Sequence, residues 1–396
     1  MKRIVAIISL CALLPIGGAA AQPSTGADVL LVPSGPLYAE PVGNGADIML
    51  QNLILANRGR DPVEIVTLEV EFTGSGESRS THRIAIPTLV NNSRELAGMA
   101  AQGMGPLVGA QLLDSRGAAA FGGENARLST DARLETGELL AGTARYYALP
   151  FVPETIRIAA TYRAADGGER MATVVSPVAV RPARLGYTLP LAGIWNMRGL
   201  AGARSHHRRI PSNEFAVDFF RLGTDGAISA GDNLVATNSF GYGAPVLAAA
   251  DGTVVAVNAD ETQDRTVYGL REGETRETAG RRIQQYRMAR MAEDFRGALA
   301  GNLITIRHEF PDGRVEYSNY GHLAAGSVRV AVGDRVTRGQ EIARVGDTGD
   351  SSVVHLHFQL NAGPDPFFSR SLPVRFDNMR ETFGGQDAGI FVTSTD

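Results

Sequence analysis

The sequence contains very little cysteine, lysine and tryptophan for a chain of 396 residues. Its only cysteine, Cys11, lies in an apolar run near the N-terminus, so the rest of the chain offers neither a disulfide nor a cysteine nucleophile. The only lysine, Lys2, precedes that run, which excludes a lysine nucleophile from the rest of the chain. The fold must therefore be held together by buried apolar surface, and a chain of this length can supply enough of it for about two domains.

The first residues have the pattern of a secretory signal peptide. Two basic residues, Lys2 and Arg3, precede an apolar run over residues 4–16, and small residues follow up to Ala21. The pattern predicts a signal peptide over residues 1–21 and a mature protein that is secreted into the periplasm. No later run approaches the roughly 18 apolar residues that a transmembrane helix needs, so no transmembrane segment is expected.

The charge of the chain argues against two classes of partner. The formal net charge is −4, and no run of basic residues occurs. Proteins that bind nucleic acid or an anionic membrane surface usually carry a cluster of basic side chains. Neither partner is therefore expected.

Residues 28–181 consist largely of short segments in which apolar and polar residues alternate, such as 47–55, 63–72, 155–162 and 171–175. Alternation of period two between turns rich in glycine, asparagine and aspartate predicts antiparallel strands with one buried face. We predict a mainly β protein whose N-terminal part is an immunoglobulin-like β-sandwich. Residues 93–113 lack the alternation and predict one short helix. This half shows no catalytic constellation, so we assign it to spacing or to binding a partner or substrate.

Three of the seven histidines lie near the C-terminus, at His322, His355 and His357. Successive side chains of a strand point to opposite faces, so His355 and His357 share one face and Leu356 points to the other. Two imidazoles on one face can bind a metal ion or a substrate. The glycine-bearing residues 346–349 between these histidines lack the lysine of a phosphate loop and lead into a strand, which predicts a plain turn.

Four segments of the second half resemble, in order, the core of the lysostaphin/LytM-type zinc endopeptidases. They occupy residues 243–255, 320–323, 332–340 and 355–358. Enzymes of this family cut peptide cross-links of bacterial peptidoglycan. The resemblance covers about the last half of the chain. It implies an antiparallel β peptidase-like domain with a groove over residues 210–372, and it implies zinc as the cofactor.

The family's zinc ligands carry over to this sequence only in part. Family members have a histidine four residues before an aspartate, and both side chains bind zinc. Asp218 matches the aspartate and His357 matches a later zinc-binding histidine, whereas Glu214 occupies the position of the first histidine. The identity of the third ligand is therefore the central question that the sequence raises.

The sequence leaves three answers open. Glu214 could bind zinc itself, because a carboxylate oxygen is an accepted ligand, although two carboxylates and one imidazole make a harder site than two imidazoles. Alternatively, His206 or His207 could fold back from an upstream loop and supply the nitrogen. In the third case no metal is bound and the fold serves as a binding module.

If zinc is bound, the resemblance assigns the catalytic roles to His322 and His355. Imidazole titrates near neutral pH, so these side chains could orient or deprotonate a water molecule and stabilise a tetrahedral intermediate. The sequence offers no Gly-x-Ser-x-Gly motif as an alternative nucleophile.

The regions around this domain are predicted from composition. Residues 182–209 contain proline and glycine and predict a linker between the two domains. Residues 259–300 are charged and carry apolar residues at helical spacing, which predicts a helical insertion. The polar residues 373–396 predict a loosely ordered tail.

Two functions follow from these observations. The first is a secreted zinc endopeptidase that acts on the cross-link peptides of peptidoglycan. The alternative is a catalytically degenerate member of the family that binds peptidoglycan or regulates another cell-wall hydrolase. The presence of Asp218, His322, His355 and His357 favours the enzyme, and the substitution at Glu214 favours the binding module.

Overall fold

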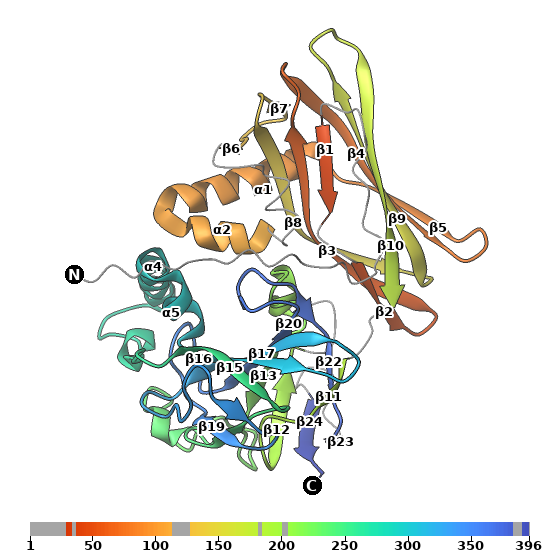
Figure 1. The fold of residues 1–396 in the computed structure, drawn as a ribbon. Coiled ribbons are helices and arrows are strands. Elements are labelled where there is room, and N and C mark those ends of the chain that lie inside the picture. Colours follow the sequence, from red (N-terminus) through yellow and green to blue (C-terminus); the bar gives the residue numbers. More distant parts are fainter. Residues whose placement is uncertain are drawn as a thin grey trace.

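The computed structural model describes residues 29–33, 37–112, 127–180, 184–199, 205–382 and 390–395. The signal peptide predicted for residues 1–21 lies outside them. Within these ranges, no helix has both the length and the apolar character needed to cross a membrane. Figure 1 shows two β-rich lobes, one built from the first half of the chain and one from the second.

The strands of the first half form one continuous hydrogen-bonded sheet in the order β5-β4-β9-β10-β2-β3-β8-β6, with β1 paired to β3 and β7 to β4. Strand β10 pairs with β9 along residues 169–177 and with β2 along residues 178–180. The strand bounds are β1 Val29–Pro33, β2 Leu37–Val42, β3 Gly45–Asn57, β4 Val63–Gly74, β5 Arg79–Arg83, β6 Arg127–Leu128, β7 Arg133–Leu134, β8 Glu138–Leu149, β9 Pro153–Arg163 and β10 Glu169–Val180.

Alternate residues of these strands fill one hydrophobic core. On β4, Leu68, Val70 and Phe72 are buried, and on β9 Ile156 and Ile158 lie in the same cluster. The mainly β class and the period-two alternation are therefore confirmed. The immunoglobulin-like arrangement stays a prediction. Strand β10 joins the two sets of strands, because it pairs with β9 along one stretch and with β2 along the next.

The helix predicted for residues 93–113 is longer than expected and is interrupted. Helix α1 spans Ile86–Met99, a π-helical turn η1 spans Ala100–Met104, and α2 spans Gly105–Leu112. Gly103 has φ 86°, in the left-handed region that favours glycine, and this residue bends the chain between the two helices.

The second half is built on another ten-stranded sheet, in the order β18-β15-β16-β17-β20-β13-β12-β24-β23, with β21 paired to β20. Two-stranded pairs β11-β22 and β14-β19 complete it. The bounds are β11 Arg184–Tyr187, β12 Ile194–Arg198, β13 Val217–Phe220, β14 Pro245–Leu247, β15 Gly252–Asn258, β16 Asn302–Glu309, β17 Val315–Leu323, β18 Arg335–Val336, β19 Glu341–Arg344, β20 Leu356–Asn361, β21 Ser371–Leu372, β22 Val374–Phe376, β23 Met379–Thr382 and β24 Ile390–Ser394.

The structure differs from the prediction of a linker and a loose tail. The predicted linker contributes β11 and β12, and the predicted tail contributes β22, β23 and β24. The physical reason is apolar burial, because Trp195 is 2% exposed and Val392 is 1% exposed, and these residues face each other in the β12-β24 pair. Strands this short have too few alternating positions to be recognised in the sequence.

The predicted insertion is helical, as expected. It contains a short 3₁₀ helix η4, Arg265–Tyr268, followed by α4, Arg276–Glu293, and α5, Phe295–Ala300. Arg265 is 5% exposed and donates to Asp347 Oδ2 at 3.1 Å and to the carbonyls of Asn233 and Ser352. The insertion is thereby fastened to the turn that precedes His355.

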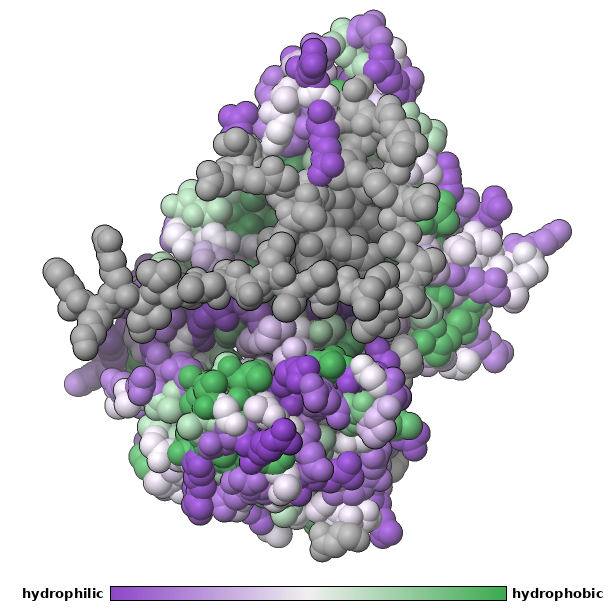
Figure 2. All heavy atoms as spheres, in the orientation of Figure 1, coloured by the Kyte–Doolittle hydropathy of each residue, from purple (hydrophilic) through white to green (hydrophobic). Residues whose placement is uncertain are grey.

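The surface of the second lobe mixes polar and apolar side chains. Figure 2 shows polar side chains over much of its visible face, with apolar groups between them. Two of the most exposed large apolar residues, Leu270 at 60% and Val332 at 63%, belong to separate loops.

We predict that Arg265→Ala destabilises the protein by about 3–5 kcal/mol, because it leaves the buried carboxylate of Asp347 without its partner. The matched control is Arg281→Ala, which removes a solvent-exposed pair with Glu277 one helical turn away. Such exposed helix pairs contribute about 0.3–0.5 kcal/mol. Urea unfolding of both variants measures the difference, and equal losses would contradict the structural role of Arg265.

A buried imidazole in the same sheet predicts a pH dependence of stability. His308 is 1% exposed, its Nδ1 donates to the carbonyl of Asp251, and its Nε2 accepts from the hydroxyl of Ser318. Burial lowers the pKa of His308 from 6.5 to about 4, although the Asp251 carbonyl opposes this shift.

Between pH 6.5 and pH 4 the unfolded chain therefore binds a proton that the folded protein does not bind. The contribution of His308 is fully present above pH 6.5 and is lost as the pH falls, by about 3 kcal/mol at pH 4. The variant His308→Gln cannot titrate. The stability of wild type relative to this variant should fall by that amount between pH 7 and pH 4, and a constant difference would show that His308 is not held neutral.

Candidate metal centre

Three neighbouring strands bring the predicted site residues together. In the antiparallel pair β13-β20, Asp218 lies directly opposite His357. On the other side of β20, His357 pairs with Gly321 of β17, and His322 follows in the chain. Leu356 is fully buried in the core, whereas His355 and His357 line a cavity, as the alternation predicts.

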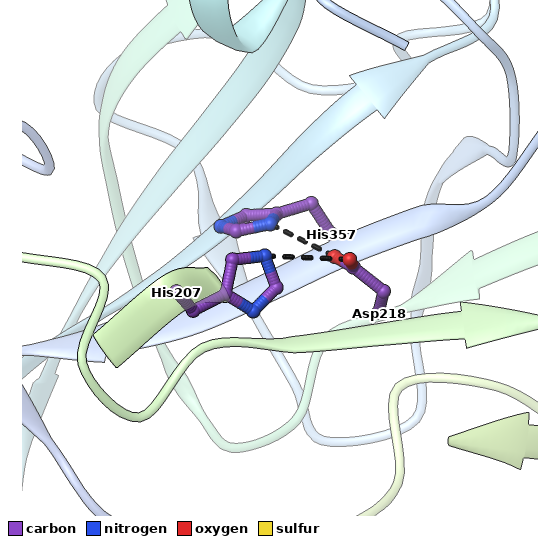
Figure 3. Close-up of side chains that lie close together, drawn as sticks. All are labelled: His207, Asp218 and His357. Carbon is purple, nitrogen blue, oxygen red and sulfur yellow. Dashed lines mark hydrogen bonds and ion pairs between the residues drawn. The ribbon is translucent and has the colours of Figure 1, made fainter. Parts of the chain in front are cut away.

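The third member of the centre is His207, which lies on the 3₁₀ helix η2, His206–Arg209. Its Nε2 lies 3.3 Å from Asp218 Oδ2, and His357 Nδ1 lies 3.0 Å from Asp218 Oδ1 (Figure 3). One possible ligand atom from each of the three side chains lies within 4.8 Å of the other two. Of the three answers that the sequence left open, the geometry therefore favours the one in which the upstream loop supplies His207. The side chain of His206 is not among those that the structure describes.

Each of the two imidazoles turns one ring nitrogen towards Asp218 and donates through the other to an outer acceptor. His207 Nδ1 donates to the carbonyl of Ala216 at 3.2 Å, so Nε2 is the nitrogen that would bind a metal ion. His357 Nε2 donates to Gln359 Oε1 at 2.8 Å, so Nδ1 is the nitrogen that would bind it. Outer hydrogen bonds of this kind fix the tautomer and the ring orientation of metal-binding histidines.

Gln359 has little freedom to turn its oxygen away from His357. Its amide nitrogen donates to Asn361 Oδ1 and to the carbonyl of Pro366, both at 2.8 Å. The side-chain oxygen must therefore face the imidazole. Residue 359 continues the alternation of residues 355 and 357, so this spacing could have revealed Gln359, but we did not single it out in the sequence.

The donor set fits zinc. Two imidazole nitrogens and one carboxylate oxygen are three ligands of a catalytic zinc site, which keeps a fourth position open. The spacings of 3.0 and 3.3 Å between donor atoms are close to the edge of a tetrahedron with bonds of about 2.0–2.1 Å. Asp218 and His207 are buried, so a cation bound there would be shielded from solvent.

Glu214, the replacement ligand suggested by the sequence, lies outside this group. Its carboxylate is buried between two arginines, with Oε1 3.3 Å from Arg208 Nη2 and Oε2 3.5 Å from Arg370 Nη2. Glu214 lies four residues before Asp218, as the family's histidine does, but it is not in the candidate ligand group. The chain between Glu214 and Asp218 turns the Glu214 carboxylate towards the two arginines instead. The geometry favours His207 over Glu214 as the third ligand.

The two predicted catalytic histidines stand beside the metal group. His355 Nδ1 donates to the carbonyl of Val353 at 2.8 Å, and its Nε2 lies 3.6 Å from Asp218 Oδ1. His322 Nδ1 donates to the carbonyl of Thr348 at 2.8 Å. The ring centroids of His322 and His355 are 4.6 Å apart. Each ring therefore keeps Nε2 available to accept a proton.

His322 has a strained backbone. Its φ is 58°, in the left-handed region that is costly for a residue with a side chain. Such strain persists where the surrounding structure imposes it, and it is concentrated at functional sites. The bond from His322 to Thr348 and the end of β17 at Leu323 impose it here.

Burial and mutual charge set the pKa values of the group. Burial raises the pKa of Asp218, but the charges of His355 and His207 and hydrogen bonds from His207 and His357 outweigh it and hold this pKa well below its usual range. Burial lowers the pKa of His322 and of His355, and it also acts on His357, where the bond to Asp218 and its charge outweigh burial and raise the pKa. The centre therefore attracts one positive charge close to Asp218.

These side chains line a cavity of about 410 Å³. Its wall combines the imidazoles with apolar residues of the insertion and of the loop after β20, including Leu299 and Phe367. Asp350 also lines it and pairs with Arg287 of α4 at 2.7 Å, so the helical insertion contacts the rim. A metal centre beside two imidazole bases in a cavity of this kind is typical of a metal-dependent hydrolase.

Comparison with known proteins agrees with this class. The model of peptidase family M23 matches residues 282–367, a range that contains His322, His355 and His357 but neither His207 nor Asp218. The predicted resemblance of the C-terminal part to lysostaphin/LytM-type peptidases is thus confirmed for this region. No match was found among curated proteins.

Similar solved structures include the catalytic domain of lysostaphin from Staphylococcus simulans, which has 21% identity, covers 48% of this chain and 88% of that chain, and gives a TM-score of 0.22. A zinc-containing peptidase from Vibrio cholerae has 16% identity, covers 87% of this chain and 84% of that chain, and gives a TM-score of 0.24. The assignment of the site rests on the side-chain geometry rather than on these similarities.

We predict that Gln359→Met weakens zinc binding by about 10–100-fold, because the variant no longer fixes the ring of His357. The control is Thr305→Val, which removes a buried hydrogen bond to Asn319 Oδ1 but contacts neither Gln359 nor a proposed ligand. Competition with a chelator measures both affinities. Equal affinities in the two variants would contradict the orienting role of Gln359.

Proposed function

We propose that the protein is a secreted zinc-dependent endopeptidase that hydrolyses peptide bonds in the cross-links of bacterial peptidoglycan. The observation that carries this proposal is the convergence of His207, Asp218 and His357 on one point, with His322 and His355 at the same cavity. The match to peptidase family M23 supports the substrate class. The signal-peptide pattern over residues 1–21 supports export.

In this proposal one set of residues would hold the metal ion, and His322 and His355 would transfer protons. His207 Nε2, a carboxylate oxygen of Asp218 and His357 Nδ1 would hold the zinc ion. When bound, zinc lowers the pKa of a coordinated water to about 7 and polarises a carbonyl group as a Lewis acid.

His355 has the geometry of a general base. Its Nδ1 hydrogen is used by the carbonyl of Val353, so Nε2 carries the lone pair that accepts a proton from the attacking water. The carboxylate of Asp218, 3.6 Å away, stabilises the imidazolium that forms. The same nitrogen then returns the proton to the leaving amine. The ring of His322 lies beside that of His355, with centroids 4.6 Å apart, and its Nε2 can also accept a proton because Nδ1 donates to the carbonyl of Thr348.

The shape of the site suits an extended peptide. The first cavity shares Leu303, Pro366 and Phe367 with a second cavity of about 510 Å³ beside α5. A groove that continues from the centre towards α5 can hold several residues of an extended peptide on one side of the bond that is cleaved.

The alternative function, a catalytically degenerate module that binds peptidoglycan or regulates another cell-wall hydrolase, rested on the missing histidine at position 214. The position of His207 removes that reason, because the centre has its two imidazoles and one carboxylate without Glu214. We therefore favour the enzyme.

We predict that His355→Gln retains zinc but lowers hydrolysis of cross-linked peptidoglycan by about 10²–10⁴-fold, the usual contribution of a general base. His207→Ala should instead lose zinc and activity together. Metal analysis of each purified variant and the release of peptide fragments from peptidoglycan provide the two measurements.

The outcome that would contradict the proposal is a wild-type protein that binds peptidoglycan but releases no fragments after zinc loading. This result would restore the binding module. A His207→Ala variant with full zinc content would instead show that the ligand set is wrong.

A further inference from the structure

The metal-binding segment η2 is held by the N-terminal sheet. Gln51 of β3 donates its side-chain amide to the carbonyl of Arg208 at 3.2 Å, a buried hydrogen bond between the two halves of the chain. Glu40 of β2 accepts from Arg208 Nη1 at 2.9 Å. Arg208 is the residue next to His207, so both contacts act directly beside a proposed ligand.

Arg208 is also fixed from the side of the second half. Its side chain is 3% exposed and lies 3.3 Å from Glu214, which pairs in turn with Arg370. The guanidinium of Arg208 lies over the ring of Phe215 at 5.9 Å, and that ring meets Tyr38 of β2 edge-on at 5.7 Å. The contact between the two halves of the chain is thus a cluster of oppositely charged side chains that packs against two aromatic rings.

A buried cluster of this kind fixes the positions of its side chains but adds little to the stability of the fold. Buried ion pairs repay their desolvation only when the geometry is good, and removing one partner is costly. The 3₁₀ helix η2 is only four residues long, and such short turns take their position from what they contact. The departure at Glu214 now has a structural meaning, because the carboxylate that replaces the family's histidine holds Arg208 instead of zinc.

We propose that Glu40 and Gln51 are positioning residues of the metal centre, which hold η2 through Arg208 so that His207 Nε2 faces Asp218. This inference rests on the proposed function, in which His207 is a zinc ligand. It makes the N-terminal sheet a part of the metal centre. Zinc affinity and the contact between the two halves of the chain are then coupled. A change that stabilises this contact would raise zinc affinity, and zinc binding would stabilise the contact.

The test compares two double variants of the full-length protein. Glu40→Gln with Gln51→Leu removes the negative charge that pairs with Arg208 and the hydrogen bond to its carbonyl. The matched control, Glu64→Gln with Asn52→Leu, removes an exposed ion pair to Arg163 and the hydrogen bonds of Asn52 to the carbonyls of Gln111 and Leu112, all within the first half of the chain. Zinc affinity is measured by chelator competition, and the absorption spectrum of the cobalt-substituted protein reports the ligand geometry.

We expect the first double variant to bind zinc at least 10-fold more weakly than wild type and to show a changed cobalt spectrum. The control should stay within about 2-fold of wild type with an unchanged spectrum, although it loses the same kinds of contact. The single variant Glu40→Gln, at a side chain that is 24% exposed, should show a smaller loss of affinity in the same direction.

Unchanged zinc affinity and an unchanged spectrum in both Glu40→Gln and the first double variant would overturn the inference. Failure of the proposed ligand set would look different, because His207→Ala would then bind zinc as wild type does. If His207→Ala loses zinc while the Glu40 and Gln51 variants keep it, only the positioning role is wrong.

Discussion

The pairing of Asp218 with His357 across strands β13 and β20 is the interaction on which the rest of the site depends. It buries a carboxylate among imidazoles, and a buried carboxylate is tolerated only with a compensating positive charge and hydrogen bonds. His207, His355 and His357 surround it within 3.6 Å. A proton on His357 can meet this need, and so can a metal ion held by the same atoms. The need of the buried Asp218 carboxylate for nearby positive charge thereby explains why three imidazoles surround it.

The sheet supplies two of the three proposed ligands, and a separate segment supplies the third. Asp218 and His357 are fixed by strand register, which the buried residues on the opposite face of β13 and β20 enforce. His207 has no such support, because it lies on a short turn between the two lobes. Its position depends on Arg208 and on the carboxylates of Glu40 and Glu214. The first half of the chain, which carries no catalytic group of its own, thus contributes to the geometry of the centre.

Local patterns were enough to predict the parts of the structure that depend on periodicity. Alternation predicted that His355 and His357 share a face, and composition predicted the helical insertion. The choice of His207 could not be made from the sequence, since it depends on how the chain from Arg208 to Glu214 folds back between two lobes. The short strands β11, β12, β22 and β24 were missed for a related reason, because each pairs with a strand distant in the sequence.

A crystal structure of the zinc-loaded full-length protein, with the ion located by its anomalous scattering, tests the central claim most directly. The account predicts one zinc ion at about 2.0–2.2 Å from His207 Nε2, from a carboxylate oxygen of Asp218 and from His357 Nδ1, with Glu214 still paired to Arg208. An ion bound by Glu214, or a His207 turned away from a zinc ion that Asp218 and His357 hold, would contradict it.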